Sequence, residues 1–297
     1  MSCTHTVTGA TGNTGRIIAE ILLEGGHNAR VVGRSADRLQ ALVDKGAEAF
    51  VGSLDDADFL AQAYKGADSV YAMIPPSLQS DDFVVYADKI SKAHVAAIRE
   101  AGVKNVVALS SIGAHRPDGN GIVKALYHFE QDLRGLEDVN VLVLRPSYFM
   151  DNIYPQVDVV KLMGFVGSPV SPDVSQPVVH TRDIGGVAAA RMTEAGFKGH
   201  THEYILGERD ISYKEITAVL GKAIGKDDLA YVQFPADQAV AGLQQFGMSK
   251  NVAGLIVELS DGINNGVVLE DYKRTPDNTT KTSIEEFAKE FAQLFDR

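Results

Sequence analysis

Short hydrophobic runs alternate with segments of helical periodicity along the first half of the chain. The runs predict strands over residues 4–8, 29–33, 47–51, 69–74, 104–110 and 140–145. The segments between them predict helices, one from Gly15 to Gly25 and others over residues 35–45, 56–64, 79–101 and 122–133. Because the links are short, this alternation is typical of a parallel sheet with helices on both faces. We therefore expect an α/β fold with a doubly wound parallel sheet.

The alternation ends after Arg145-Pro146. Residues 164–177 are rich in Gly, Ser and Pro and predict a long loop, which inside a compact protein is usually functional. Helices are predicted over residues 213–225, 236–246 and 283–295, the last with a capping box from Ser283 to Glu286, and a short strand over 203–206. We expect the sheet domain to span residues 1–150. Residues 151–297 then form mainly a smaller α+β lobe for the substrate, with some segments returning to the sheet.

A glycine-rich turn joins the first predicted strand to the first helix. Gly9, Gly12 and Gly15 give the spacing G-x-x-G-x-x-G. A pyrophosphate is held by backbone N–H groups at a helix N-terminus only where no Cβ blocks its approach, so glycine is needed there. Arg16-Ile17 follows instead of Lys-Ser/Thr, which excludes a Walker phosphate loop. The turn predicts a Rossmann domain that binds NAD(P), with an ordinary glycine-rich turn as the alternative.

The end of the second strand predicts which dinucleotide binds. In this fold an acidic residue about 20 positions past the glycines contacts a ribose hydroxyl of NAD, whereas an Arg accommodates the 2′-phosphate of NADP. Arg34 stands at that place, and no carboxylate follows until Asp37. Arg38 adds a second positive charge and Ser35 a hydroxyl at a helix N-terminus. We therefore expect NADP(H) in preference to NAD(H); the alternative is that both arginines lie on a solvated face.

Composition narrows the remaining classes of function. The formal net charge of −11 repels a phosphate backbone, so no direct nucleic-acid partner is expected. No run of 18 apolar residues and no signal peptide are present, which favours a cytoplasmic protein without a membrane partner. Cys3 is the single cysteine, which argues against a disulfide and a cysteine-based metal site. His200 and His202 lack an evident third ligand, so we expect no metal.

Several segments together resemble the NmrA-like branch of the atypical short-chain dehydrogenases. They are Gly9-Ala10-Thr11-Gly12-Asn13-Thr14-Gly15, Val32-Gly33-Arg34-Ser35, Ile74-Pro75-Pro76, Ser110-Ser111, the helix around Glu130, Leu144 to Asn152, and Thr282 to Phe291. That branch includes NADPH-dependent quinone reductases, triphenylmethane reductase and NADPH-sensing regulators with little or no activity. The resemblance covers nearly the whole chain, and its motifs are specific for the superfamily but not for one activity.

The resemblance implies a set of cofactor contacts. The pyrophosphate would lie on Thr11, Gly12, Asn13, Thr14, Gly15 and Arg16, and the 2′-phosphate on Arg34. The adenine would lie on Gly52-Ser53-Leu54 and the nicotinamide ribose on Met73-Ile74-Pro75, with Ser110 also at the cofactor. Ser53 departs from the Asp often found beside the adenine in this family.

The catalytic pair of typical short-chain dehydrogenases is missing. Those enzymes carry Tyr-x-x-x-Lys on the fifth helix, with a Glu four residues after the Lys. If Glu130 is that Glu, the Lys position is Leu126 and the Tyr position is Ile122. Reducing a simple ketone makes a basic alkoxide that needs a positioned acid. A quinone gives a delocalised hydroquinone anion that water protonates, so acceptors with their own electron sink are compatible with this chain.

Two segments supply candidate residues for the acceptor. They are Tyr127, His128, Tyr148, Phe149 and Asn152, from the fifth helix and the end of the sixth strand. Tyr148 and Phe149 are suited to stacking on a flat acceptor or to packing the two lobes together. His128 is suited to donating a hydrogen bond to a carbonyl or to a structural role.

Three functions follow from these observations. The first is an NADPH-dependent oxidoreductase acting on a quinone or similar conjugated small-molecule acceptor. The second is a non-catalytic NADP(H)-binding redox sensor that acts through a regulatory protein partner. The third is an epimerase or carbonyl reductase that uses Tyr127 or His128 as an unconventional acid. A homodimer is compatible with each of them. No G-x-S-x-G motif for a nucleophilic Ser is present, which disfavours a hydrolase.

Overall fold

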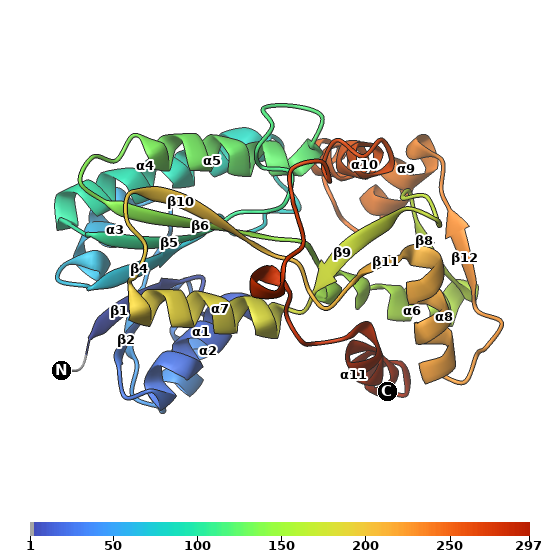
Figure 1. The fold of residues 1–297 in the computed structure, drawn as a ribbon, viewed down its shortest axis with the longest axis horizontal. Helices are drawn as coiled ribbons and strands as arrows, with labels where there is room; N and C mark the ends of the chain where they lie inside the picture. The colour runs from blue at the N-terminus through green and yellow to red at the C-terminus, as the bar shows by residue number, and fades with distance from the viewer. Residues whose placement is uncertain (1–2) are drawn as a thin grey trace.

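A seven-stranded parallel sheet forms the centre of the molecule (Figure 1). The structure is a computed structural model that describes residues 3–297. The strands are β1 (Thr4–Thr8), β2 (Asn28–Gly33), β3 (Glu48–Val51), β4 (Ser69–Ala72), β5 (Asn105–Leu109), β6 (Asn140–Pro146) and β10 (His200–Ile205). Their order across the sheet is β10-β6-β5-β4-β1-β2-β3. The chain therefore winds outward in both directions from β1 and β4, which confirms the predicted doubly wound sheet.

Helices cover both faces of this sheet, as Figure 1 shows. On one face lie α3 (Ala57–Tyr64), α4 (Phe83–Ala101) and α5 (Lys124–Arg134), and on the other α1 (Asn13–Glu24), α2 (Ala36–Val43) and α7 (Thr181–Glu194). A strand that is buried on both faces needs apolar side chains at successive positions. β5 shows this, because Val106, Val107 and Ala108 are all fully buried.

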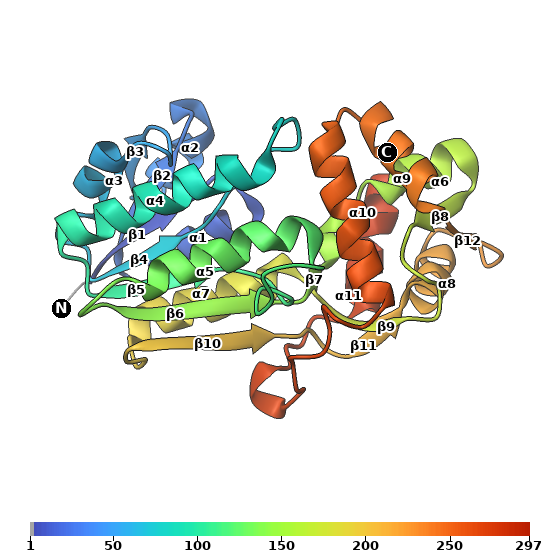
Figure 2. The same cartoon turned by 90° about the horizontal axis from the view of Figure 1, so that it is seen from above.

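A second group of elements lies beside the carboxyl ends of the strands (Figure 2). It has a three-stranded sheet of β7 (Tyr148–Phe149), β9 (Ser175–Val179) and β11 (Asp210–Ser212), and a pair of β8 (Phe165–Ser168) and β12 (Ala230–Gln233). Its helices are α6 (Gln156–Met163), α8 (Tyr213–Ala223), α9 (Ala236–Gln245), α10 (Lys250–Asn264) and α11 (Ile284–Phe295). Short 3₁₀ turns cover Gly121–Val123, Met150–Ile153 and Pro276–Asn278.

The second half of the chain differs from its prediction in several places. The prediction of a long loop over residues 164–177 is wrong, because β8 and the start of β9 lie within this segment. The helices α6, α7 and α10 were not predicted. α7 contains Gly185, where a Cβ would lie 2.6 Å from Cγ2 of Ile17, so glycine at this position lets the helix approach α1 closely. The capping box from Ser283 to Glu286 and the Ser35 cap of α2 are confirmed.

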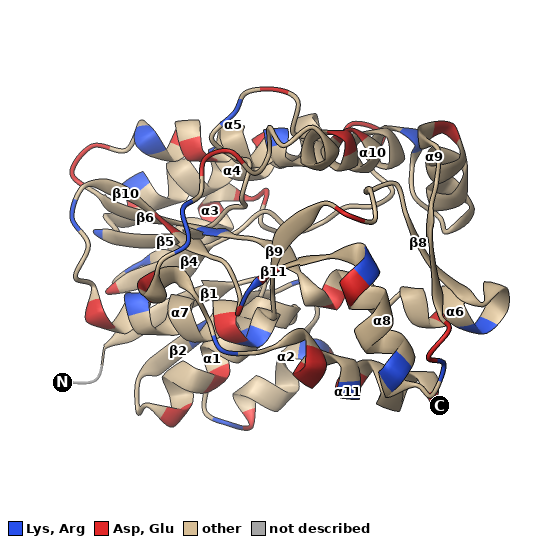
Figure 3. Ribbon diagram, turned by 45° about the vertical axis from the view of Figure 1, so that its right-hand side comes forward, with Lys and Arg blue, Asp and Glu red and all other residues tan. Residues whose placement is uncertain are grey.

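Charged residues are spread over many of the elements, with both signs interspersed (Figure 3). Within residues 3–297, no helix has the length and apolar composition required to cross a bilayer.

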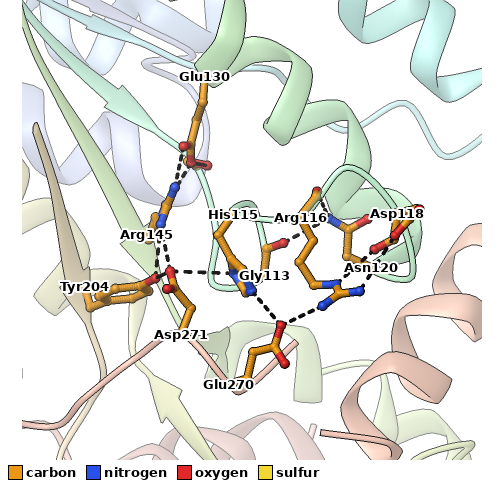
Figure 4. A network of polar contacts seen from close by, with 11 residues as sticks. Gly113, His115, Arg116, Asp118, Asn120, Glu130, Arg145, Tyr204, Glu270 and Asp271 are labelled. Atoms are coloured by element: carbon orange, nitrogen blue, oxygen red, sulfur yellow. Dashed lines mark hydrogen bonds and ion pairs between the residues drawn. The ribbon is translucent and has the colours of Figure 1, made fainter. Parts of the chain in front are cut away.

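A buried ion pair fastens α5 to the sheet (Figure 4). The Arg145 guanidinium of β6 donates from Nε to Glu130 Oε1 at 3.0 Å and from a terminal nitrogen to Oε2 at 2.7 Å, and both side chains are buried. This two-point geometry is the strong form of an Arg–carboxylate pair. Ser110, at the end of β5, donates its hydroxyl to the same Glu130 oxygen at 2.6 Å. Three elements therefore meet at one carboxylate.

The same arginine reaches the chain segment that follows α10. Arg145 donates to Asp271 Oδ2 and to the Tyr204 hydroxyl, each at 3.1 Å, and Tyr204 in turn donates to Asp271. Glu270, which precedes Asp271, accepts a hydrogen bond at 2.6 Å from Arg116 (Figure 4). Arg116 lies in the loop after β5. Polar contacts therefore hold the segment after α10 against the edge of the sheet formed by β6 and β10.

A second buried polar chain runs beneath the end of β4. His94 of α4 is fully buried, with its Nε2 3.2 Å from the Met73 carbonyl and its Nδ1 2.7 Å from the Tyr64 hydroxyl. A carbonyl only accepts, so Nε2 carries the proton and Tyr64 donates to Nδ1. Burial lowers the pKa of His94 to about 4, so the ring is neutral near pH 7.

This histidine predicts a loss of stability in mild acid. The unfolded chain binds the His94 proton with an ordinary pKa of 6.5, whereas the folded chain binds it only near pH 4, so the unfolded state gains protons first as the pH falls. The contribution amounts to about 2 kcal/mol between pH 7 and pH 5. We expect His94→Gln to remove that part of the pH dependence, measured as the free energy of unfolding in urea at both pH values. The prediction would be contradicted if the free energy of unfolding changed by the same amount between pH 7 and pH 5 in both proteins.

Candidate functional site

The glycine-rich turn brings β1 and α1 into backbone contact. Gly9 has a φ of +64°, a backbone conformation that residues other than glycine rarely adopt. A Cβ at Gly15 would lie only 2.4 Å from the Gly9 carbonyl oxygen, so the helix can pack this closely on the turn only with glycine. Gly12 donates its N–H to the Gly9 carbonyl at 2.9 Å. The three glycines thus have the separate steric roles that a dinucleotide turn requires.

The N-terminus of α1 is left open. Its N-cap is Gly12, with no side-chain cap and no acidic residue in the first turn. The neighbouring helices α2, α3 and α4 are each capped by a side chain, from Ser35, Asp56 and Asp82. An uncapped first turn keeps N–H groups and the positive end of the helix dipole available to an anion. The exposed Asn13 and the half-buried Thr11 border this turn, so its donors and shape fit a pyrophosphate.

Cations lie beside this turn at the end of β2. Arg34 and Arg38 are exposed, and Ser35 is half-buried. Arg38 donates to the Thr11 carbonyl at 3.2 Å, which joins the start of α2 to the glycine turn. Ser35 accepts from the Arg38 N–H, and its own hydroxyl proton remains to be donated. Burial raises the pKa of the Tyr86 hydroxyl, and the positive charge of Arg34 opposes the rise.

The adenine segment predicted after β3 lies next to Arg34. Gly52 donates its N–H to the Gly33 carbonyl at 3.0 Å, which keeps the ends of β2 and β3 together. A Cβ at Gly52 would lie 2.6 Å from the Phe59 ring. Leu54 is buried and Ser53 is exposed, so only Ser53 presents its side chain to solvent there.

Met73, Ile74 and Pro75 follow β4 directly and lie next to the glycine turn. The Met73 sulfur lies 2.8 Å from the point where a Cβ of Gly9 would be. Ile74 is buried and Pro75 half-buried. The Met73 carbonyl is fixed from below by His94. The hydrogen bond from His94 of α4 therefore holds the backbone of this segment on its buried side. The other side of the segment faces the edge of the sheet.

Two residues predicted at the cofactor have committed side chains. Thr14 is buried and accepts a hydrogen bond from Tyr71 at 3.1 Å. Ser110 is buried and donates to Glu130. The Ser110 N–H is also used, since it donates to the Leu144 carbonyl at 2.8 Å, whereas the Thr14 hydroxyl accepts from Tyr71 and keeps its own proton to donate.

The predicted acceptor residues Tyr127 and His128 are neighbours on α5, whereas Asn152 lies in a different segment. His128 Nδ1 is 3.0 Å from Asp88 Oδ1 of α4, which turns this ring toward the neighbouring helix. Tyr127 is half-buried, with its ring edge against His128. Asn152 is exposed in the 3₁₀ turn after β7. Ile122 and Leu126 of the same helix region pack against the apolar core of the sheet.

Tyr148 and Phe149 point to opposite sides of β7, as neighbouring strand residues must. Phe149 packs against the core between the sheet and the helices α1 and α7. Tyr148 packs against the core of the second group of elements and lies edge-on to Tyr213, with ring centres 6.2 Å apart. Burial raises the pKa of the Tyr148 hydroxyl, partly offset by its hydrogen bond with Tyr213, so this phenol stays neutral.

A small cavity of about 40 Å³ lies beyond the ends of β5 and β6. Its walls are Ser111, Ile112, Tyr148, Gln176, Pro177, Leu259, Ile263, Val268 and Leu269. Gln176 is 2% exposed, and its Nε2 is buried without a hydrogen-bond partner. An unpaired buried donor is costly, so such a group is typical of a site that a ligand or water completes. Gln176 is not among the predicted site residues, because it lies in the segment predicted as a loop.

Known proteins resemble this chain over most of its length. A (4-alkanoyl-5-oxo-2,5-dihydrofuran-3-yl)methyl phosphate reductase of Streptomyces griseus is 29% identical over 238 residues, which cover 80% of this chain and 79% of that protein. The crystal structure of an Escherichia coli NADPH-dependent quinone oxidoreductase complexed with NADPH superposes with a TM-score of 0.80 at 20% identity and covers 96% and 99% of the two chains.

A Citrobacter triphenylmethane reductase complexed with NADP(H) has a TM-score of 0.78 at 18% identity, over 97% of this chain and 99% of that chain. At these identities the two structures establish the fold. The profile of the NmrA-like family matches residues 1–288, nearly the whole sequence. The chain therefore belongs to the NmrA-like family.

Proposed function

We propose that this protein binds NADP(H) and reduces a quinone or similarly conjugated carbonyl acceptor. The observation that carries the proposal is the open N-terminus of α1, where Gly12 replaces a capping side chain and the first turn holds no acid. When bound there, NADPH supplies a hydride. The names of the similar proteins support the same reading, since they include an NADPH-bound quinone oxidoreductase, an NADP(H)-bound triphenylmethane reductase and a reductase 29% identical to this chain.

Arg34, Ser35 and Arg38 support the choice of the phosphorylated dinucleotide. They stand at the end of β2, within reach of the glycine turn through the Arg38 contact with Thr11. A guanidinium presents several donors in a fixed plane and binds phosphate more strongly than a neutral group does. A ribose hydroxyl would instead call for a carboxylate at this place.

The acceptor side supports a substrate that stabilises its own negative charge. Tyr148 is a neutral phenol that already interacts with Tyr213, and His128 is turned toward Asp88, so neither is arranged as a free acid. Gln176 Nε2 is a buried donor that has no partner among the described residues, and it would hold the carbonyl oxygen on which charge develops. The cavity is smaller than an aromatic ring, so it would receive the carbonyl end of the acceptor.

Calorimetric titration with NADPH and NADH, followed by a panel of quinones, tests the proposal. We expect tighter binding of NADPH, and a loss of its absorbance when a quinone is added. Binding of NADPH without its consumption by any acceptor would favour the non-catalytic redox sensor. Absence of binding would overturn the cofactor assignment itself.

Arg34→Glu should reverse the cofactor preference. The change removes a charge-assisted hydrogen bond to the 2′-phosphate and offers an acceptor to the ribose hydroxyl. We expect the dissociation constant for NADPH to rise by about 10- to 100-fold and that for NADH to fall, both measured by calorimetry. Lys198→Glu changes the charge equally at an exposed position before β10 and serves as the control. Unchanged discrimination in Arg34→Glu would remove this residue from the phosphate site.

Gln176→Leu should slow the reduction without weakening cofactor binding. Leu has a similar size but no donor, so the loss of a hydrogen bond to developing charge should lower kcat for the quinone roughly 100-fold. The free energy of unfolding should stay equal or rise, because an unpaired buried amide is removed. Gln244→Leu, at an exposed position of α9, is the matched control. Full activity of Gln176→Leu would place the carbonyl elsewhere.

A further inference from the structure

Cys3, His5 and His27 meet at the end of the sheet opposite the glycine turn. Cys3 and His5 are two residues apart around the start of β1, so their side chains point to the same side. His27 precedes β2, which pairs with β1 in parallel from Thr4 and Asn28 onward. Asn28 donates its N–H to the Cys3 carbonyl at 2.9 Å, which brings His27 next to Cys3. The strand register therefore gathers a thiol and two imidazoles from two chain segments.

The ligand atoms of these three side chains lie close together, and within residues 3–297 two of the imidazole nitrogens have no hydrogen-bond partner. One sulfur or nitrogen atom from each residue lies within 4.8 Å of the other two. His5 is 1% exposed, and its buried Nε2 has no hydrogen-bond partner in the part of the chain that the structure describes. The Nδ1 atom of His27 is also buried without one, and the two ring centres are 5.1 Å apart. Two unpaired buried nitrogens in one cluster leave a polar centre that the protein groups do not complete.

Hydrogen bonds fix which nitrogen of His5 carries its proton. The Ser69 hydroxyl donates to the Met192 carbonyl at 3.3 Å, so its single proton is already used. Its oxygen, 2.7 Å from His5 Nδ1, must then accept from that nitrogen. His5 Nε2 therefore presents a lone pair toward the cluster. A metal-binding histidine typically has this arrangement, with one nitrogen donating to an oxygen and the other free to coordinate.

We propose that Cys3, His5 and His27 bind one zinc ion at the amino end of the sheet, with water as the fourth ligand. In a tetrahedral zinc site with bonds of about 2.0 to 2.3 Å, neighbouring ligand atoms are about 3.3 to 3.6 Å apart. The cluster approaches that geometry and needs small side-chain rotations to reach it. A thiolate with imidazoles selects zinc over the oxygen-preferring Mg²⁺ and Ca²⁺. Cys3 and His27 are half-buried, which leaves the fourth position accessible to water.

The zinc ion would stabilise the fold and take no part in the reduction. β1 separates the cluster from the glycine turn, and its five residues span about 16 Å. The ion would tie the start of β1 to the turn between α1 and β2, and so close a loop of more than twenty residues. The proposed site differs from the prediction made from the cysteine count. That prediction did not consider that one thiol can bind a metal together with histidines.

Titration of the metal-free full-length protein with ZnCl₂ tests the site. We expect one zinc ion per chain by calorimetry and a higher Tm on saturation, because the metal binds the folded state. Co²⁺ in place of zinc should give a sulfur-to-metal charge-transfer band together with the visible bands of a tetrahedral site. Cys3→Ser should abolish the charge-transfer band, and Cys3→Ser and His27→Gln should each weaken zinc binding at least tenfold. Binding and reduction of substrates should be unchanged in both variants.

His202→Gln, which replaces an exposed histidine on β10, is the control and should bind zinc as the unaltered protein does. The variants at Cys3 and His27 avoid the fully buried His5, so folding is retained for the comparison. Equal zinc affinity in the control and in both variants would overturn the proposal. Absence of zinc binding, or binding of Cu⁺ alone, would overturn it as well.

Discussion

The contact between Gly15 and the Gly9 carbonyl is the constraint on which the functional geometry depends. With no side chain between them, α1 starts directly at the end of β1 and points its first turn at the edge of the sheet. Any larger residue at position 15 would push the helix away, since a Cβ there has no room. The proposed anion site would therefore be built from backbone, at a helix end that the sequence leaves uncapped.

The segments around this turn were predictable because their signals are local. Glycine spacing, the Ser35 cap and the hydrophobic run of each strand all lie within a few residues, and the structure confirms the cap and the doubly wound sheet. The pairing of β1 with β2, of β2 with β3 and of β4 with β5 also agrees with the tendency of consecutive strands to be neighbours. The NADP(H) contacts assigned to Arg34 and its neighbours remain predictions, although the structure brings Arg38 to the glycine turn.

The second half was harder to predict because its partners are distant in the sequence. β10 pairs with β6 across about sixty residues, and β9 joins β7 to β11, so no local pattern reveals either sheet. Pro177 and the Gly and Ser residues before it predicted a loop, yet Gln176 and Pro177 lie in a strand. The orphaned amide of Gln176 is visible only in three dimensions. Ser110 shows the converse, since its hydroxyl is directed to Glu130.

Buried polar groups in this protein fall into two kinds, and the difference separates scaffold from candidate sites. Glu130, Arg145 and His94 have their hydrogen-bonding groups paired within the protein, so they fix the positions of α5, α4 and the Met73 carbonyl without needing a ligand. The Nε2 atoms of Gln176 and His5 are buried and unpaired. An unpaired buried donor or lone pair persists only where something outside the chain completes it or where the fold tolerates its cost. Gln176 lies beyond the carboxyl ends of the parallel strands and His5 at their amino ends, so the two proposed sites would be independent, and the loss of one would leave the other intact.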